Sequence, residues 1–269
     1  MIEALRLANL LKRLGYPLTG LLVLTLTGAL TYWVLNRSRV SGWFKGSQDF
    51  ATTLIGIPSI LFALFTTTLA SDVWSRYQKA NDVLIIETSA MRGIMAASLN
   101  ISDGKEHLLN AVENYALAVV KTEWPAMVVG DHSGKETALR ELRQLSTVCL
   151  NLGGRKDQPA VIATRLLQSM DAIRTSRLQR LSLAHDAISP TKWEAILLFG
   201  MLVVFTVGIV HIRRPRAMGI AMSVAVICVV GTIYVLSSNR NPYAGPSAIL
   251  PTTMVEALHI LEQSETPAD

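Results

Sequence analysis

The stretch GIPSILFALF, residues 56–65, lies in an uncharged run, Phe50–Ser71, that is long enough to cross a membrane. Three further runs of similar length are also free or almost free of charge: Pro17–Leu35, Ala195–Ile212 and Ala217–Asn239. A helix needs roughly 17–25 residues to cross about 30 Å of hydrocarbon. Backbone groups in lipid must be satisfied within their own segment, which favours helices. The sequence therefore predicts an all-α, four-span integral membrane protein.

The composition agrees with this prediction. Of the 269 residues, half are hydrophobic and only 17% are charged, whereas soluble domains carry about 25% charged residues. The net charge of +5 is modest and dispersed, and no basic stripe interleaved with aromatic residues indicates a nucleic-acid partner. Membrane lipid is the partner that the composition predicts.

The chain divides at the ends of its apolar runs. Residues 1–71 contain an amphipathic N-terminus and the first two spans, and residues 72–191 form the only large polar region. Its helical periodicity predicts an extramembrane helical domain between spans two and three. Residues 192–240 hold spans three and four as a hairpin, and residues 241–269 contain an irregular turn and an amphipathic helix expected to pack on that domain.

Residue types that support catalysis or metal binding are scattered. His211 has no cysteine or carboxylate at ligand spacing, the other four histidines are scattered, and no zinc-protease, nucleophile-elbow or P-loop motif occurs. No Asp, Glu, Lys or Arg lies inside an apolar run, which disfavours a proton-coupled carrier that relies on buried carboxylates. We therefore expect neither an enzyme nor a resident cofactor or metal. Arg174, Arg177 and Arg180 recur every three residues and are expected to form a solvated face.

The second span carries an apolar stripe. Ile57, Leu61 and Phe65 follow one another at four-residue steps, so they share one face of a helix. Pro58 is expected to kink the helix, and Thr66 to Thr68 follow as a polar collar. Copies of this helix around an axis would form a hydrophobic neck, which can gate ions by dewetting. The alternative is that the stripe packs against lipid or a neighbouring helix, with the threonines bonded to their own backbone.

Several short motifs resemble the bestrophin family, and more closely its bacterial bestrophin-like domain members. They are IPSILFALF with TTTLASDVWSRY at 57–77, YALAVVKTEWPAM at 115–127, RTSRLQRLSLAHDAISPTKW at 174–193 and NPYAGPSAIL at 241–250. The last of these is similar to the turn after the final span in bestrophins, here Asn241, Pro242 and Tyr243. The acidic run that binds calcium in animal members is replaced by Ala244–Ala248, so we expect no calcium site.

The resemblance implies a homo-oligomeric, pentameric ion channel. Its neck would be Ile57, Leu61 and Phe65, and Thr66 and Thr68 would be polar pore-lining residues. The partners would be other copies of the chain, membrane lipid and inorganic ions. The resemblance also places the chain in the bacterial inner membrane, with the central domain in the cytoplasm. The charge of the loops does not decide this orientation, because both sides carry similar numbers of Lys and Arg near the membrane.

A second function stays open from the residues alone. The chain could be a membrane-anchored scaffold or sensor whose helical domain binds a partner, and the apolar stripe would then be ordinary packing. Subunit number and bilayer conductance distinguish the two functions.

Overall fold

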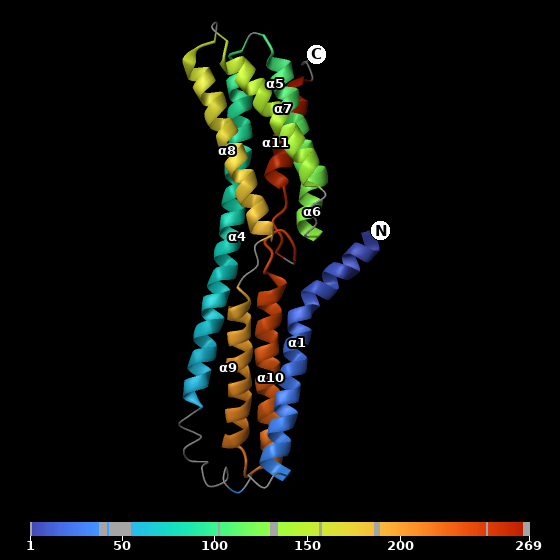
Figure 1. The fold of residues 1–269 in the computed structure, drawn as a ribbon, viewed down its shortest axis with the longest axis vertical. Helices are drawn as coiled ribbons and strands as arrows, with labels where there is room; N and C mark the ends of the chain where they lie inside the picture. The colour runs from blue at the N-terminus through green and yellow to red at the C-terminus, as the bar shows by residue number, and fades with distance from the viewer. Residues whose placement is uncertain are drawn as a thin grey trace. The chain divides into compact units, whose positions relative to one another are not determined.

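The computed structural model describes residues 2–37, 42, 55–101, 103–129, 134–155, 158–185, 189–245 and 247–265 (Figure 1). Every regular element in these ranges is a helix, which confirms the all-α prediction. The helices are α1 (Ile2–Arg37), α4 (Gly56–Ser98), α5 (Lys105–Ala118), the π-helical turn η1 (Val119–Glu123), α6 (Trp124–Val129), α7 (Lys135–Gly153), α8 (Ala160–His185), α9 (Pro190–Val210), α10 (Pro215–Ser238) and α11 (Thr252–Glu265).

The chain forms two compact units. The first comprises residues 1–75 and 187–240, and the second comprises residues 76–186 and 241–269. Helix α4 contributes its first 20 residues to the first unit and the remainder to the second.

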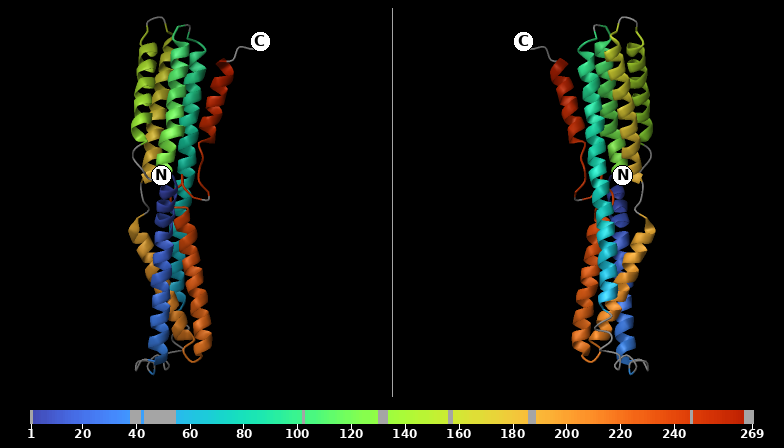
Figure 2. Two further views of the ribbon diagram at one scale, coloured as in Figure 1. Left: turned by 90° about the vertical axis from the view of Figure 1, so that its right-hand side faces the viewer. Right: turned by 90° about the vertical axis from the view of Figure 1, so that its left-hand side faces the viewer.

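The first unit contains α1, α9, α10 and the beginning of α4. Four stretches in the described chain each contain a segment that is long and apolar enough to cross a membrane, as predicted: Leu18–Arg37, Gly56–Ser98, Pro215–Ser238 and, taking α8 and α9 together, Ala160–Val210. Helices α1, α9 and α10 pack pairwise (Figures 1 and 2). Small residues permit close approach of membrane helices. A Cβ atom added to Gly200 would lie 2.8 Å from Val229 Cγ1, and one added to Gly208 would lie 2.9 Å from Thr31 Cγ2. Both distances are too short for a larger residue without a shift of the neighbouring side chain.

Prolines begin the last two helices of this unit. Pro190 and Pro215 occupy the first positions of α9 and α10, where a missing N–H removes no helical bond. At the end of the unit that contains Pro190, Lys192 of α9 forms an ion pair with Asp72 of α4. This pair fixes α9 against α4 at the edge of the apolar segment.

The second unit is a helical bundle made by the rest of α4 with α5, α6, α7, α8 and α11. In the two views of Figure 2, α4, α5, α7 and α8 lie side by side. Its core consists of apolar side chains from all these helices, including Leu84, Met91, Leu108, Leu145, Leu166 and Leu258. The apolar faces of these amphipathic helices are thus buried against one another.

Candidate functional site

Helix α4 begins at Gly56, which places Pro58 in its first turn. The first four N–H groups of a helix have no internal partner, so Pro58 removes no bond from the described helix. The Ser59 hydroxyl donates to the carbonyl of Ile55 at 2.8 Å and its backbone N–H does so at 3.3 Å. In the described residues Pro58 therefore starts the helix, and the expected kink has no helical segment before it to bend.

The three predicted neck residues have different surroundings in the first unit. Ile57 is 58% exposed, whereas Leu61 and Phe65 are half-buried. The Phe65 ring lies 5.0 Å from the ring of Phe199 on α9, centroid to centroid, and Phe65 packs against the core of the unit. A four-residue step advances slightly more than one turn, so the predicted stripe rotates from the outer face of α4 toward its own subunit.

A different set of α4 residues forms the outward face. Ile60 is 68% exposed and Leu64 is 59% exposed. Exposed residues recur at alternating steps of three and four: Ile57, Ile60, Leu64, Thr67, Ser71 and Trp74. This spacing keeps one face of a helix in register over several turns. Sequence reasoning missed Ile60 and Leu64 because it counted only the four-residue steps.

The threonines at 66–68 also differ from one another. The Thr66 hydroxyl is buried and has no hydrogen-bond partner in the described structure. Thr67 and Thr68 are exposed, and their hydroxyls donate to the carbonyls of Ala63 and Leu64, each at 2.9 Å. Such back-bonded hydroxyls use their hydrogen and keep both lone pairs available to accept. Backbone bonding and an outward position are therefore compatible at Thr68.

The second unit contains a buried cluster of charged side chains, namely Glu87 of α4, Glu123 of η1 and Arg177 and Arg180 of α8. Arg180 donates to Glu87 through Nε at 2.8 Å and Nη2 at 3.1 Å, and its Nη2 also donates to Glu123 at 2.7 Å. Arg177 Nε donates to Glu123 at 3.0 Å. The Tyr115 hydroxyl completes the cluster by donating to Glu87 at 2.6 Å.

The expectation of a solvated arginine face is wrong for two of its three members. Arg174 is exposed, but Arg177 is 4% exposed and Arg180 is fully buried. Burying a charge is costly unless it is paired and hydrogen-bonded, and both carboxylates here are paired. Sequence reasoning could not find these pairs because Glu87 and Glu123 lie 93 and 57 residues from Arg180.

The cluster shifts the pKa values of Arg180 and Tyr115. Burial alone would lower the pKa of Arg180, but the carboxylates of Glu87 and Glu123 outweigh burial and raise that pKa further above its ordinary value. Burial raises the pKa of Tyr115, and the negative charge of Glu87 adds to the effect. The arginine therefore stays charged and the tyrosine stays neutral.

Two predicted sequence motifs meet beside this cluster. Trp124, which follows η1, lies with its ring 5.4 Å from Arg180 Cζ, a cation–π contact. Tyr243, of the turn after α10, meets the Trp124 ring edge-on at 5.3 Å. That turn is closed by Asn241, whose side-chain oxygen accepts from the Tyr243 N–H at 3.0 Å, and by Ile249 N–H donating to Pro242 at 2.9 Å. The turn thereby anchors the C-terminal segment on the bundle.

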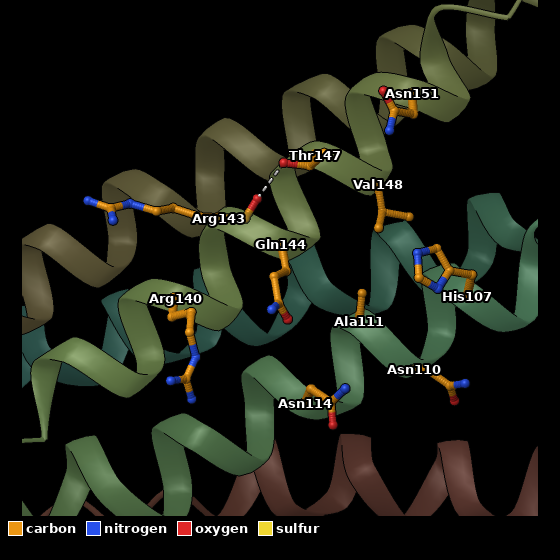
Figure 3. Close-up of a pocket in the computed structure, with 10 residues that line it drawn as sticks. All are labelled: His107, Asn110, Ala111, Asn114, Arg140, Arg143, Gln144, Thr147, Val148 and Asn151. Atoms are coloured by element: carbon orange, nitrogen blue, oxygen red, sulfur yellow. Dashed lines mark hydrogen bonds between the residues drawn. The ribbon is translucent and has the colours of Figure 1, made fainter.

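A polar groove lies between α5 and α7 of the second unit (Figure 3). Its volume is about 520 Å³, and its lining is His107, Asn110, Ala111, Asn114, Arg140, Arg143, Gln144, Thr147, Val148 and Asn151. Figure 3 shows Arg140 directed toward Asn114 and Arg143 directed away from the other lining residues. All its polar side chains are exposed, so this groove is a surface feature.

Comparisons with known proteins find solved structures with a similar fold. A bacterial bestrophin homologue from Klebsiella pneumoniae, solved as two point mutants, matches with TM-scores of 0.62 and 0.61 at 12% identity. These matches cover 91% and 95% of this chain and 98% and 100% of the homologue. A structure described as a membrane protein matches with a TM-score of 0.60 at 13% identity, covering 96% and 99%. Among curated proteins, none matches the sequence.

A family model decides the assignment. The bestrophin-like domain model matches residues 22–254, which include most of the first candidate span, the other three spans, the charged cluster and the turn after α10. Because this match covers most of the sequence, the chain belongs to the bestrophin-like domain family.

Proposed function

We propose that this chain is a homo-oligomeric ion channel, with five subunits, whose conduit is lined by α4. The observation that carries the proposal is the outward face of α4 in a bestrophin-like chain. Within the apolar segment of α4, 11% of the residues are buried inside the subunit, compared with 22% in the segment of α1 and 28% in that of α10. The α4 segment is also the least apolar of the four candidate spans. The α4 segment therefore has the fewest buried residues and the lowest apolarity of the segments compared. A helix with these properties is better placed beside a water-filled pore than against lipid.

The chemistry of this face changes along the helix. It begins with Ile57, Ile60 and Leu64 and continues with the hydroxyl residues Thr67 and Ser71. A lipid-facing surface would gain nothing from exposed hydroxyl groups, whereas a conduit with a short apolar constriction and a wetted continuation would present this order. The constriction would control conduction by excluding water when closed.

Two registers of α4 could form that constriction. The register predicted from the sequence uses Ile57, Leu61 and Phe65, and the register of the exposed face uses Ile57, Ile60 and Leu64. We favour the second because a ring of copies turns inward the face that a single copy leaves exposed. Leu61 and Phe65 would then lie at the flank of the neck, where Phe65 already contacts Phe199.

The test is ion flux in proteoliposomes containing the full-length chain. Replacing Ile60 and Leu64 together by serine should hydrate the constriction and raise passive flux severalfold. Ile220→Ser is the matched control, because Ile220 on α10 is as exposed as Ile60, at 68%, but lies outside the proposed conduit. Unchanged flux in a folded Ile60→Ser/Leu64→Ser variant, or an equal increase with Ile220→Ser, would contradict the proposal.

The second candidate function is a membrane-anchored scaffold or sensor. The observation that favours it is the polar groove between α5 and α7, because exposed amides and arginines are suited to a polar partner. This function predicts a monomer or dimer in detergent and no conductance in planar bilayers. Particle images with five-fold symmetry, together with measurable conductance, would exclude it.

A further inference from the structure

The first unit has an apolar groove between α1 and α10. Its volume is about 400 Å³, and its lining is Leu21, Thr25, Gly28, Ala29, Tyr32, Gly219, Met222, Ser223, Val226 and Ile227. The lining extends from Gly219 to Ile227 on α10, which corresponds to about 12 Å along the helix axis. A narrow apolar groove of this length has the dimensions of a lipid acyl chain.

The two helices run antiparallel along this groove. A Cβ on Gly28 would lie 3.9 Å from Met222 Cε, and one on Gly219 would lie 4.0 Å from Tyr32 Cε2. Tyr32 and Gly219 therefore mark the same end. Arg216 precedes Gly219 by one helical turn, about 4.5 Å along the axis, and the turn before α10 adds Arg213 and Arg214.

These three arginines are exposed. Within the part of the chain that the structure describes, no ion pair or hydrogen bond engages their guanidinium groups. Guanidinium groups bind phosphate through charge-assisted, often bidentate hydrogen bonds. A positive group at the end of an apolar groove is therefore placed to meet the headgroup of the molecule whose tail fills the groove.

We propose that this groove binds an anionic phospholipid, with an acyl chain between α1 and α10 and the phosphate at Arg216 and its neighbours. A helix from a second copy of the chain is the rival occupant. The four apolar runs contain no Asp or Glu, so such a helix would bring no anion to the arginines. Charge complementarity therefore selects the lipid.

Native mass spectrometry of the purified full-length chain tests the charged end. Phosphatidylglycerol should bind more tightly than phosphatidylcholine with the same acyl chains. Arg216→Gln should weaken phosphatidylglycerol binding about fivefold, as expected for the loss of one basic residue near a lipid surface, and weaken phosphatidylcholine binding less, because its choline offsets the phosphate charge. Arg174→Gln, an exposed arginine of the second unit, should leave both unchanged. Equal affinity of the unmodified chain for the two lipids would overturn the proposal.

A glycine pair on α10 tests the apolar part. Gly219→Leu should fill the groove and weaken binding of both lipids. Gly231→Leu is its control, because a Cβ there meets no atom within 4 Å. If Gly219→Leu does not fold, Ala29→Leu fills the same groove from α1. Retained lipid binding with loss of subunits would instead assign the groove to a second copy. Competition by glycerol phosphate as effective as that by the intact lipid would show that the apolar groove is not used.

Discussion

Arg180 shows how this protein accommodates buried charge. Its guanidinium is completely buried, yet it donates to two carboxylates and lies over the Trp124 ring. The energy gained from such a buried pair is offset by the desolvation of its charges, so the pair adds little net stability. Removing one partner is different, because the remaining charges stay buried without compensation.

Arg180→Met should therefore lower the free energy of unfolding by about 3–5 kcal/mol, because the buried Glu87 would lose its ionic partner and Glu123 one of its two. Arg174→Met, on the same helix but exposed, should change it by less than about 0.5 kcal/mol. Thermal unfolding in detergent, followed by circular dichroism, measures both. Similar midpoints for the two variants would contradict the structural importance of the cluster.

The Cys149 thiol provides a pH-dependent readout of burial. Burial raises the pKa of Cys149 from 9.0 to about 12. Below pH 9 the thiol is neutral in both the folded and unfolded chain, and its contribution to stability is fully present. Between these values only the unfolded chain ionises, so stability falls as pH rises, by up to roughly 1.4 kcal/mol per pH unit.

Cys149→Ala should accordingly make the decline of stability between pH 9 and 10 less steep, and the buried Tyr115 and Tyr243, whose pKa values are also raised, should supply the slope that remains. Cys228→Ala is the matched control, because Cys228 is exposed, and should leave the slope as it is in the unmodified chain. Denaturation midpoints measured across this pH range decide the question. A slope unchanged by Cys149→Ala would show that its thiol ionises in the folded state.

At the level of helices, the two sides of α4 should respond oppositely to truncation. Phe65→Ala removes the contact with Phe199 and should destabilise the chain by about 1–3 kcal/mol, less than a fully buried phenylalanine. Ile60→Ala truncates an exposed side chain and should leave stability nearly unchanged while raising flux. Measuring thermal midpoint and flux on the same preparations separates the registers. A flux increase in Leu61→Ala and Phe65→Ala, but not in Ile60→Ala and Leu64→Ala, would support the neck residues predicted from the sequence instead.

The helices were predictable because length and apolarity suffice to identify a span, and caps and prolines identify its ends. Pro190 and Pro215 begin α9 and α10 close to where the apolar runs begin. The register of the exposed face of α4 was not predictable, because a four-residue step and a three-four alternation both describe one face near its start. The two patterns can be distinguished only once Phe199 is known to contact one side of α4. Arg177 was missed because an i,i+3 arginine pattern on a polar helix ordinarily indicates solvent.

For the whole molecule, the side of the membrane on which the second unit lies is the main expectation left to test. We expect the cytoplasmic side. Asn151→Cys in a Cys228→Ala background places one exposed thiol in the α5–α7 groove, since Cys149 is buried. A membrane-impermeant maleimide should label it in inverted vesicles and leave intact spheroplasts unlabelled, and labelling of spheroplasts would reverse the orientation.

The π-helical turn η1 has a consequence for sequence length. In it the Trp124 N–H donates to Val119, five residues back, instead of the usual four, so the turn accommodates one extra residue. Deleting Lys121 would let an ordinary four-residue turn form in its place, so the segments on either side would keep nearly the same direction around the helix axis. This short segment should therefore tolerate loss of the exposed Lys121 far better than replacement of Glu123, which pairs with Arg177 and Arg180.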